Sequence, residues 1–216
     1  MTTLDTKQPF VAIEGLDGTG KTTQCQLLQA RWPQEKFAVK TYIDPGDTPA
    51  GTEIRKLLKA KEPPLSTMST ALLFLAARRE LALRIQHEKP FLAITDRWML
   101  STLAYQGTGP DRVPVDFLSH LGSLVVPLMP SLTIVLDIPA EIAWQRTKDR
   151  ALGTADRFET DVEIYRQRAF IYEHASGLIS NVVHVAGLGP VQEVSERVIQ
   201  AIHEAFPQCD WILRKR

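Results

Sequence analysis

The sequence predicts an α/β fold in which a parallel sheet is covered by helices on both faces. Short apolar runs of strand length alternate with segments of helical periodicity from one end of the chain to the other, and this alternation is typical of parallel sheets. Polar motifs directly follow several of these runs, at the strand ends where such sheets bind ligands. The 216 residues, 44% of them hydrophobic, suffice for one sizeable core, so we expect one domain with small mobile parts.

The first elements are expected between residues 10 and 64. Phe10–Glu14 is a short apolar run that predicts a buried strand, Thr22–Trp32 predicts a helix, and Phe37–Ile43 predicts a second strand. The loop Asp44–Gly51 is rich in Pro and Gly, which favour turns, and a helix follows it to about Lys59. A Pro-Pro pair then ends that helix, because proline has no N–H to donate.

The remaining elements continue the alternation. Thr67–His87 predicts one long helix, because apolar residues recur along it at helical spacing. The later strands are short apolar runs, expected at Phe91–Thr95, Leu132–Asp137 and Val182–Val185. The later helices are expected at Met99–Tyr105, from Ala140 to about Arg150, at Val162–Ser176 and at Val191–Phe206.

The charge balance and the cysteines exclude several classes of protein. Lys+Arg and Asp+Glu both count 25, and this zero formal charge argues against a nucleic-acid binder. Cys25 and Cys209 have no metal or redox spacing and are expected as free thiols in a reducing compartment. No apolar run is long enough to span a membrane, and Met1–Gln8 lacks the apolar stretch of a signal peptide. Residues 1–8 are therefore expected as a loose polar lead, and the protein as cytoplasmic.

The segment Gly15–Thr22 (GLDGTGKT) matches the phosphate-binding loop (P-loop) pattern G-x-x-x-x-G-K-[ST]. Its glycines let several backbone N–H groups point at one phosphate, and the helix that follows adds its positive N-terminal end. Lys21 would neutralise the outer phosphates, and the Thr22 hydroxyl can ligate Mg²⁺. The loop predicts a site for a nucleoside triphosphate made by Gly15, Leu16, Asp17, Gly18, Thr19, Gly20, Lys21, Thr22 and Thr23.

Two further charged positions extend this prediction. Asp96 follows the third strand, where P-loop proteins hold Mg²⁺, and the planar fork of Arg97 beside it could grip a second phosphate. An ordinary surface ion pair is the alternative. Asp17 lies inside the phosphate cradle, where a carboxylate is unfavourable unless it meets Mg²⁺ or a sugar hydroxyl, so it indicates a substrate hydroxyl nearby.

Two more groups are ambiguous from spacing. Phe74 and Arg78 share a helix face and could stack on a base and donate to its carbonyl, but core packing and a solvated charge explain that spacing better. A basic group lies in and after the helix that follows the fourth strand. A mobile flap over a phosphoryl group and a solvated helix end with favourable cations account for this group equally well. The group comprises Arg146, Lys148, Arg150 and Arg157.

Five segments resemble, in order, the motifs of the thymidylate kinase family. Together they place residues 10–206 in register with that family. The segments are Phe10–Gln24, Asp44–Thr48 (DPGDT), Leu73–Arg78 (LFLAAR), Asp96–Gly107 (DRWMLSTLAYQG) and Asp156–Glu159 (DRFE).

The resemblance implies one P-loop nucleoside monophosphate kinase domain over residues 1–216, with a lid at about 146–160. It implies transfer of the γ-phosphoryl group of ATP, with Mg²⁺, to dTMP, giving dTDP and ADP, by a homodimer that binds no nucleic acid and no membrane. The alternatives are a kinase for another nucleotide or nucleoside, a GTPase-type switch, for which the Asn-Lys-x-Asp motif is missing, and a non-catalytic nucleotide-binding protein.

The resemblance also implies roles for single residues. In the acceptor site, Phe74 stacks on thymine, Arg78 donates to its carbonyl, and Arg97 binds the dTMP phosphate. Thr102 and Gln106 face the base edge beside Ser101, Tyr105 disfavours a 2′-hydroxyl, and Asp17 meets the 3′-hydroxyl. Thr22 and Asp96 are expected to serve the metal. Some members carry Arg at the position of Gly18, so this chain is similar to the bacterial type that uses lid arginines instead. The residues expected to take part in catalysis are Asp17, Lys21, Arg97, Arg146, Arg150 and Arg157.

The chain departs from the family pattern at two positions. Asp47 stands where the family usually has Gly, and Trp98 replaces the usual Tyr or His. A carboxylate facing a bound phosphate would repel it. Asp47 is therefore expected either to point to solvent or pair with a cation such as Arg55 or Lys56, or to touch Mg²⁺ or a substrate hydroxyl and help set specificity. The favoured role is an N-cap, because Asp47 and Thr48 precede the expected helix and both residue types cap helices well.

Overall fold

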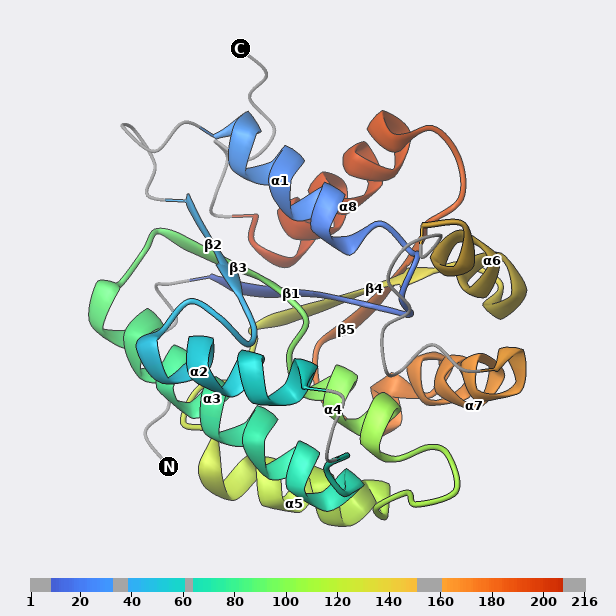
Figure 1. Ribbon diagram of the computed structural model, residues 1–216. Helices are drawn as coiled ribbons and strands as arrows, with labels where there is room; N and C mark the ends of the chain where they lie inside the picture. Colours follow the sequence, from blue (N-terminus) through green and yellow to red (C-terminus); the bar gives the residue numbers. More distant parts are fainter. Residues whose placement is uncertain (1–8, 33–38, 61–63, 151–160, 208–216) are drawn as a thin grey trace.

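A parallel sheet forms the centre of the protein (Figure 1). The computed structural model describes residues 9–32, 39–60, 64–150 and 161–207. Within these residues the strand order is β2-β3-β1-β4-β5, and neighbouring strands pair in parallel. The strands are β1 (Phe10–Glu14), β2 (Val39–Ile43), β3 (Leu92–Asp96), β4 (Leu132–Asp137) and β5 (Val182–Ala186). The predicted α/β fold with a parallel sheet is confirmed.

Helices cover both faces of this sheet. They are α1 (Lys21–Arg31), α2 (Pro49–Lys59), α3 (Thr67–Glu88), α4 (Met99–Gln106), α5 (Val115–Val125), α6 (Ala140–Arg150), α7 (Val162–Glu173) and α8 (Val191–Ala205), with a short 3₁₀ turn, η1, at Ala175–Gly177. Figure 1 shows α1 and α8 on one face and α2, α3, α4 and α5 on the other. Of the helices described, none is both long and apolar enough to cross a membrane.

The central strand β1 shows why the sheet needs both layers. Successive side chains of a strand point to opposite faces. Val11 and Ile13 pack in the core under α1 and α8, whereas Phe10 and Ala12 pack in the core under α3 and α4. All four side chains are buried, as expected for a parallel strand covered on both sides.

The helix α5 was not predicted from the sequence. It begins after Pro114 and is anchored in the core by Leu118. Gly122 lets α5 approach α4, since a Cβ at this position would lie 2.2 Å from Cε of Met99. A glycine inside a helix weakens the helical pattern, and here the tertiary contact requires it. The predicted helix Val162–Ser176 is also shorter than expected, because α7 ends at Glu173.

Candidate active site

Most of the predicted site residues meet in one cleft at the carboxyl ends of β1, β2 and β3. The cleft has a volume of about 550 Å³. Of the predicted residues, those lining it are Asp17, Gly18, Gly20, Lys21, Thr22, Thr23, Phe74, Arg78, Asp96, Arg97, Ser101, Thr102, Tyr105 and Gln106. Gly15, Leu16 and Thr19 belong to the same loop but are buried in it.

The P-loop packs directly on α6 through Gly18. Gly18 has a φ of +86°, and a Cβ at this position would lie 2.5 Å from the carbonyl oxygen of Ala143. Both the backbone angle and the close approach favour glycine. In this conformation there is no room for a side chain at this position. The P-loop therefore touches the helix that leads into the predicted lid.

Lys21 is folded into the P-loop. Its Nζ donates to the carbonyl oxygen of Leu16 at 2.6 Å and lies 4.0 Å from Oδ1 of Asp17. Burial, together with the positive charge of Arg97, lowers the pKa of Lys21 to about 8. The ammonium thus lies close to its titration range in the free protein, and a bound phosphate would favour its charged form.

Asp17 and Arg97 join the P-loop to the end of β3. Their ion pair connects Oδ1 of Asp17 to Nη2 of Arg97, while Nη1 of Arg97 donates to Oγ of Ser101 at 2.8 Å. The hydroxyl of Tyr105 donates to Oδ2 of Asp17 at 2.6 Å. Burial favours the neutral carboxyl, but the charges of Arg97 and Lys21 outweigh it and hold the pKa of Asp17 well below its usual range. The protein itself therefore compensates the Asp17 charge, without the substrate hydroxyl that the sequence argument required.

Thr22 and Asp96 form an oxygen-rich corner beside the P-loop. Oγ1 of Thr22 donates to Oδ2 of Asp96, and the buried Oδ1 of Asp96 has no hydrogen-bond partner among the described residues. Mg²⁺ prefers hard oxygen ligands and usually takes only one or two from the protein, with phosphates and waters supplying the rest. The hydroxyl and carboxylate present here fit that requirement.

The residues expected to contact a base come from α3 and α4. Arg78 is buried, so the solvated charge favoured by its spacing is wrong. Its Nε donates to Oδ2 of Asp44 and its Nη1 to Oγ1 of Thr102, at 2.7 and 2.9 Å. Phe74, one turn earlier on α3, is half-buried and lines the same cleft.

The two departures from the family pattern have different structural roles. Trp98 is a core residue: it is 1% exposed, packs edge-to-face on Phe10 and donates from Nε1 to the carbonyl oxygen of Leu128 at 3.2 Å. The predicted Asp47 cap is wrong, because Thr48 caps α2 through its Oγ1 and the N–H of Gly51, at 2.9 Å. Asp47 instead closes the turn after β2.

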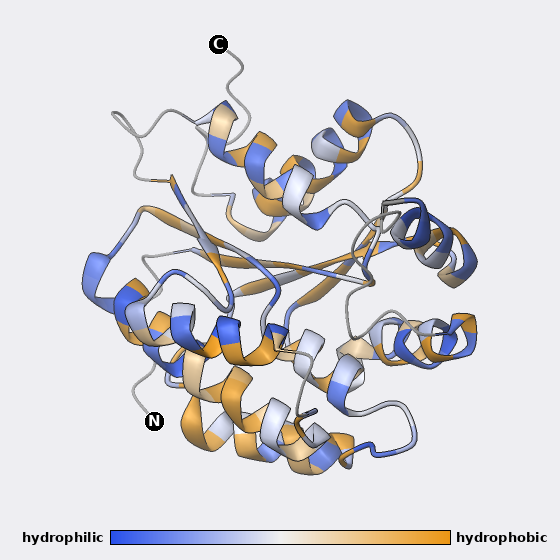
Figure 2. Ribbon diagram, viewed as in Figure 1, coloured by the Kyte–Doolittle hydropathy of each residue, from blue (hydrophilic) through white to orange (hydrophobic). Residues whose placement is uncertain are grey.

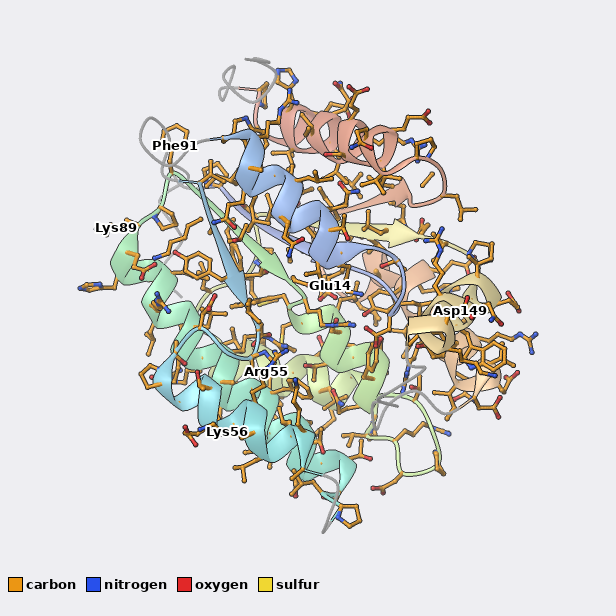
Figure 3. The ribbon with its side chains drawn as sticks, turned by 45° about the horizontal axis from the view of Figure 1, so that its top comes forward. Glu14, Arg55, Lys56, Lys89, Phe91 and Asp149 are labelled. Atoms are coloured by element: carbon orange, nitrogen blue, oxygen red, sulfur yellow. The ribbon has the colours of Figure 1, made fainter. Side chains whose placement is uncertain are left out.

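The contacts of Asp47 lie within its own loop. Its Oδ2 accepts from the N–H of Ile43 at 2.6 Å. Arg55 donates to the carbonyl oxygen of Pro45 at 2.7 Å and lines the cleft. Figure 3 shows Arg55 on the side of α2 nearer the sheet and Lys56 on the outer side. Arg55 therefore adds a cation to the cleft that the sequence analysis did not assign to the site.

Only part of the predicted lid can be described. Arg146 is exposed on α6, and its Nη1 donates to the carbonyl oxygen of Gly18 at 3.4 Å. Arg157 and the side chain of Arg150 lie outside the described residues. Arg146 is thus placed beside the P-loop by α6.

Two buried charged residues were missed by the sequence analysis. Glu14, at the end of β1 in the interior (Figure 3), accepts from the N–H groups of Trp98 and Ser101 at 2.7 and 3.0 Å and so caps α4. Arg168 of α7 is 4% exposed, and its guanidinium lies 4.1 Å from the ring centroid of Tyr105. The signal for Glu14 is a carboxylate ending an apolar run, whereas the helical pattern around Arg168 gives no signal.

The parallel sheet, the P-loop and Arg97 beside it in the same cleft define a P-loop enzyme that transfers phosphoryl groups. The family model described as thymidylate kinase matches residues 13–198. The thymidylate kinase of Gluconobacter oxydans is 34% identical over 204 residues, which cover 91% of this chain and 95% of that protein. The thymidylate kinase of Thermomicrobium roseum is 37% identical over 77% of this chain and 80% of that protein. The thymidylate kinase of Caldicellulosiruptor saccharolyticus is 30% identical over 97% of this chain and 100% of that protein. The chain belongs to the thymidylate kinase family, and the resemblance inferred from the five motifs is confirmed.

Proposed function

We propose that the protein transfers the γ-phosphoryl group of ATP to dTMP, giving ADP and dTDP. The observation that carries this proposal is the contact between Asp17 of the P-loop and Arg97 at the end of β3. The loop suited to the donor phosphates and the arginine suited to the acceptor phosphate are adjacent in one cleft. Transfer between two bound phosphates needs this adjacency and no covalent intermediate with the enzyme.

The P-loop holds the donor. Its backbone N–H groups and the start of α1 surround the phosphates, and Lys21 places a positive charge on the outer ones. Its ammonium leaves the carbonyl oxygen of Leu16, which it contacts at 2.6 Å, to reach the nucleotide. Thr22 and Asp96 would hold Mg²⁺, which would neutralise phosphate charge when bound.

The acceptor lies against α3 and α4. Arg97 grips the phosphate of the monophosphate, and Phe74 stacks on its base while Arg78 donates to it. Tyr105 stands beside Asp17, its hydroxyl 2.6 Å from Oδ2, where the sugar of a nucleotide on Arg97 would lie. A 2′-hydroxyl would meet this ring, which disfavours ribonucleotides. Ser101, Thr102 and Gln106 complete the wall of the cleft on α4.

The segment at about residues 146–160 acts as the lid of a single kinase domain. Gly18 carries no charge to the transferring phosphoryl group, so Arg146, Arg150 and Arg157 supply it as the lid closes. The support for this role is Arg146, which already lies beside Gly18. Positive charge that meets the phosphoryl group during transfer stabilises the transition state.

A substrate panel tests the function. ADP formation is measured by a coupled assay with dTMP, dUMP, dCMP, dGMP, UMP or thymidine as acceptor. The expected result is the highest kcat/KM with dTMP, exceeding dUMP by a factor of about 5 to 150 for one methyl group in an apolar pocket. A panel in which UMP or dCMP outperforms dTMP would show a kinase for another nucleotide.

The protein is further proposed to act as a homodimer in the cytoplasm. The support for a dimer is an apolar surface on α2, α3 and α5, and Figure 2 shows hydrophobic stretches along α3 and α5. Monomers rarely expose many large apolar side chains on adjacent elements. The exposed residues are Leu57, Met68, Leu72, Leu83, Phe117 and Leu124, between 36% and 67% exposed.

Light scattering coupled to size exclusion measures the oligomeric state. The wild type is expected at twice the 24.2 kDa of one chain. Exchanging Leu72 and Leu124 for Glu should give a monomer, because burying unpaired carboxylates in an apolar interface is unfavourable. A wild-type mass of one chain would refute the dimer.

A further inference from the structure

We propose that Asp44 is a positioning residue that makes the acceptor pocket select a base carbonyl over a base amino group. It does so by fixing the guanidinium of Arg78. This inference rests on the proposed function, because it concerns the base recognised by that same cleft. Asp44 follows β2 and Arg78 lies on α3, and their side chains are 0% and 2% exposed.

The carboxylate of Asp44 holds one edge of the guanidinium. Oδ2 accepts a hydrogen bond from Nε of Arg78 at 2.7 Å, and Nη2 forms an ion pair with the same oxygen, also at 2.7 Å. Two nitrogens of a rigid planar fork held on one carboxylate oxygen restrict the orientation of the fork as well as its distance. Asp44 directly follows β2 and its side chain is fully buried, which restricts its movement.

Residues of α4 and its N-terminus hold the rest of the guanidinium. Nη1 donates to Oγ1 of Thr102 at 2.9 Å and contacts Sδ of Met99 at 3.3 Å. The centre of the guanidinium lies 5.5 Å from the ring of Trp98, within cation–π range. The hydrogen bonds use Nε–H and both N–H groups of Nη1, and the ion pair with Asp44 holds one side of Nη2. One N–H of Nη2 remains for a ligand, and Arg78 lines the cleft.

A fixed donor distinguishes bases by the chemistry of their edges. Thymine and uracil present a carbonyl oxygen where cytosine presents an amino group. A carbonyl accepts a hydrogen bond from Arg78, whereas an amino group would oppose one donor with another. A site built around buried polar groups rejects an analogue that leaves them unpaired. A guanidinium free to rotate would turn its donor away and lose this discrimination.

A purely structural role for the pair makes different predictions. Breaking a buried ion pair destabilises a protein because it leaves a buried charge uncompensated. A stability effect alone would lower the melting temperature and the amount of active enzyme without changing which base is preferred. Base preference therefore separates positioning from stability.

The main experiment compares Asp44→Asn with Asp44→Glu and with a matched control, Glu88→Gln. Glu88 also bonds β2 to α3, through Lys40 and Tyr42 at 2.7 Å each, but does not line the cleft. Kinetics with dTMP and dCMP are measured below the melting temperature of each variant. For Asp44→Asn we expect KM for dTMP to rise about tenfold, while kcat and KM for ATP stay within about threefold of wild type. The ratio of kcat/KM for dTMP to kcat/KM for dCMP should fall by at least about tenfold.

Asp44→Glu keeps the charge and should retain most of the preference, and Glu88→Gln should retain all of it. In a double-mutant cycle with Arg78→Lys, the effects on KM for dTMP should be less than additive, since both changes release the same fork. A folded Asp44→Asn with wild-type KM and preference, or additive effects in the cycle, would overturn the proposal.

A second measurement uses the wild type and needs no folded variant. In the ¹⁵N spectrum of the arginine side chains, a fixed fork gives separate Nη signals for Arg78, whereas a rotating one gives an averaged signal. Separate signals that shift on addition of dTMP support the proposal, and an averaged signal refutes it. If the wild type prefers another acceptor in the substrate panel, the proposed function fails, while the Arg78 signals still report whether the fork is fixed.

Discussion

The hydroxyl of Tyr105 donates a hydrogen bond to Oδ2 of Asp17 at 2.6 Å and joins α4 to the P-loop. The same hydroxyl accepts from the N–H of Asp17 at 3.1 Å. The guanidinium groups of Arg97 and Arg168 lie 5.0 and 4.1 Å from the ring centroid of Tyr105. The ring is therefore held in place before any nucleotide binds, and the sugar subsite proposed here is preorganised.

Removing the ring of Tyr105 and removing its hydroxyl should have different effects. Tyr105→Phe keeps the ring, so the ratio of kcat/KM for dTMP to that for its ribose analogue should stay within about threefold of wild type. Tyr105→Ala opens space for a 2′-hydroxyl, and the ratio should fall by about tenfold or more. Equal ratios in Tyr105→Ala and wild type would show that another group excludes the ribose.

The lowered pKa of Lys21 predicts that ATP binding weakens at alkaline pH. Because burial and Arg97 lower this pKa to about 8 in the free protein, the ammonium loses its proton as the pH rises through 8. The charged form binds phosphate, so binding must take up a proton above that pH and the affinity falls. Calorimetry at pH 7 and pH 9, in buffers of different ionisation enthalpy, measures both effects.

Lys21→Arg serves as the control for that titration. Its guanidinium stays protonated across this range, so its ATP affinity should be nearly independent of pH even if it is weaker throughout. A wild-type affinity that is also flat between pH 7 and 9, without proton uptake, would mean that Lys21 stays charged in the free protein.

Alanine substitutions at Gly18 and Gly20 distinguish the cost of backbone strain from the cost of close packing. Both have positive φ, +86° and +94°, but a Cβ at Gly18 would meet α6 at 2.5 Å, whereas no described atom lies within 4 Å of one at Gly20. Gly20→Ala should therefore cost only the strain, about 1–2 kcal/mol, and Gly18→Ala about 1–3 kcal/mol more. Urea unfolding without nucleotide measures both, and equal costs would show that α6 moves aside freely.

Arg146 should act mainly in the transition state. It is exposed and touches Gly18 rather than the acceptor residues, so Arg146→Ala is expected to lower kcat about tenfold or more with little change in KM for dTMP. Lys56→Ala, which removes an exposed cation of α2, should leave both constants unchanged. A wild-type kcat in Arg146→Ala would place the charge on another residue of the lid.

The fold was largely predictable because the signals for its strands are local. The runs Phe10–Glu14 and Leu132–Asp137 match β1 and β4 residue for residue. The order of the strands was not predictable, since it depends on crossovers between distant segments. The helix α5 was missed because its contact with α4 requires Gly122 at a position where the sequence alone suggests weak helix formation.

The residues of the cleft were predictable where phosphate binding by the backbone restricts which residues can occur. The P-loop follows β1, Asp96 ends β3 and Arg97 follows it, and the ends of these neighbouring parallel strands must meet. The Arg78 ion pair was not predictable from spacing, because its partner Asp44 is 34 residues away on another element. The Asp47 cap was wrong for a related reason: Thr48 and Asp47 are both good N-caps, and the turn after β2 decides which one points at α2.

Transfer from ATP to dTMP is tested most directly by following the phosphoryl group itself. ATP labelled at the γ-phosphate is incubated with Mg²⁺, dTMP and the enzyme, with Lys21→Ala as the inactive control, and the products are separated. We predict that the label appears as the β-phosphate of dTDP, in the same amount as the ADP formed, and that Lys21→Ala is slower by at least about a hundredfold. Label released as inorganic phosphate while dTMP stays unchanged would contradict it.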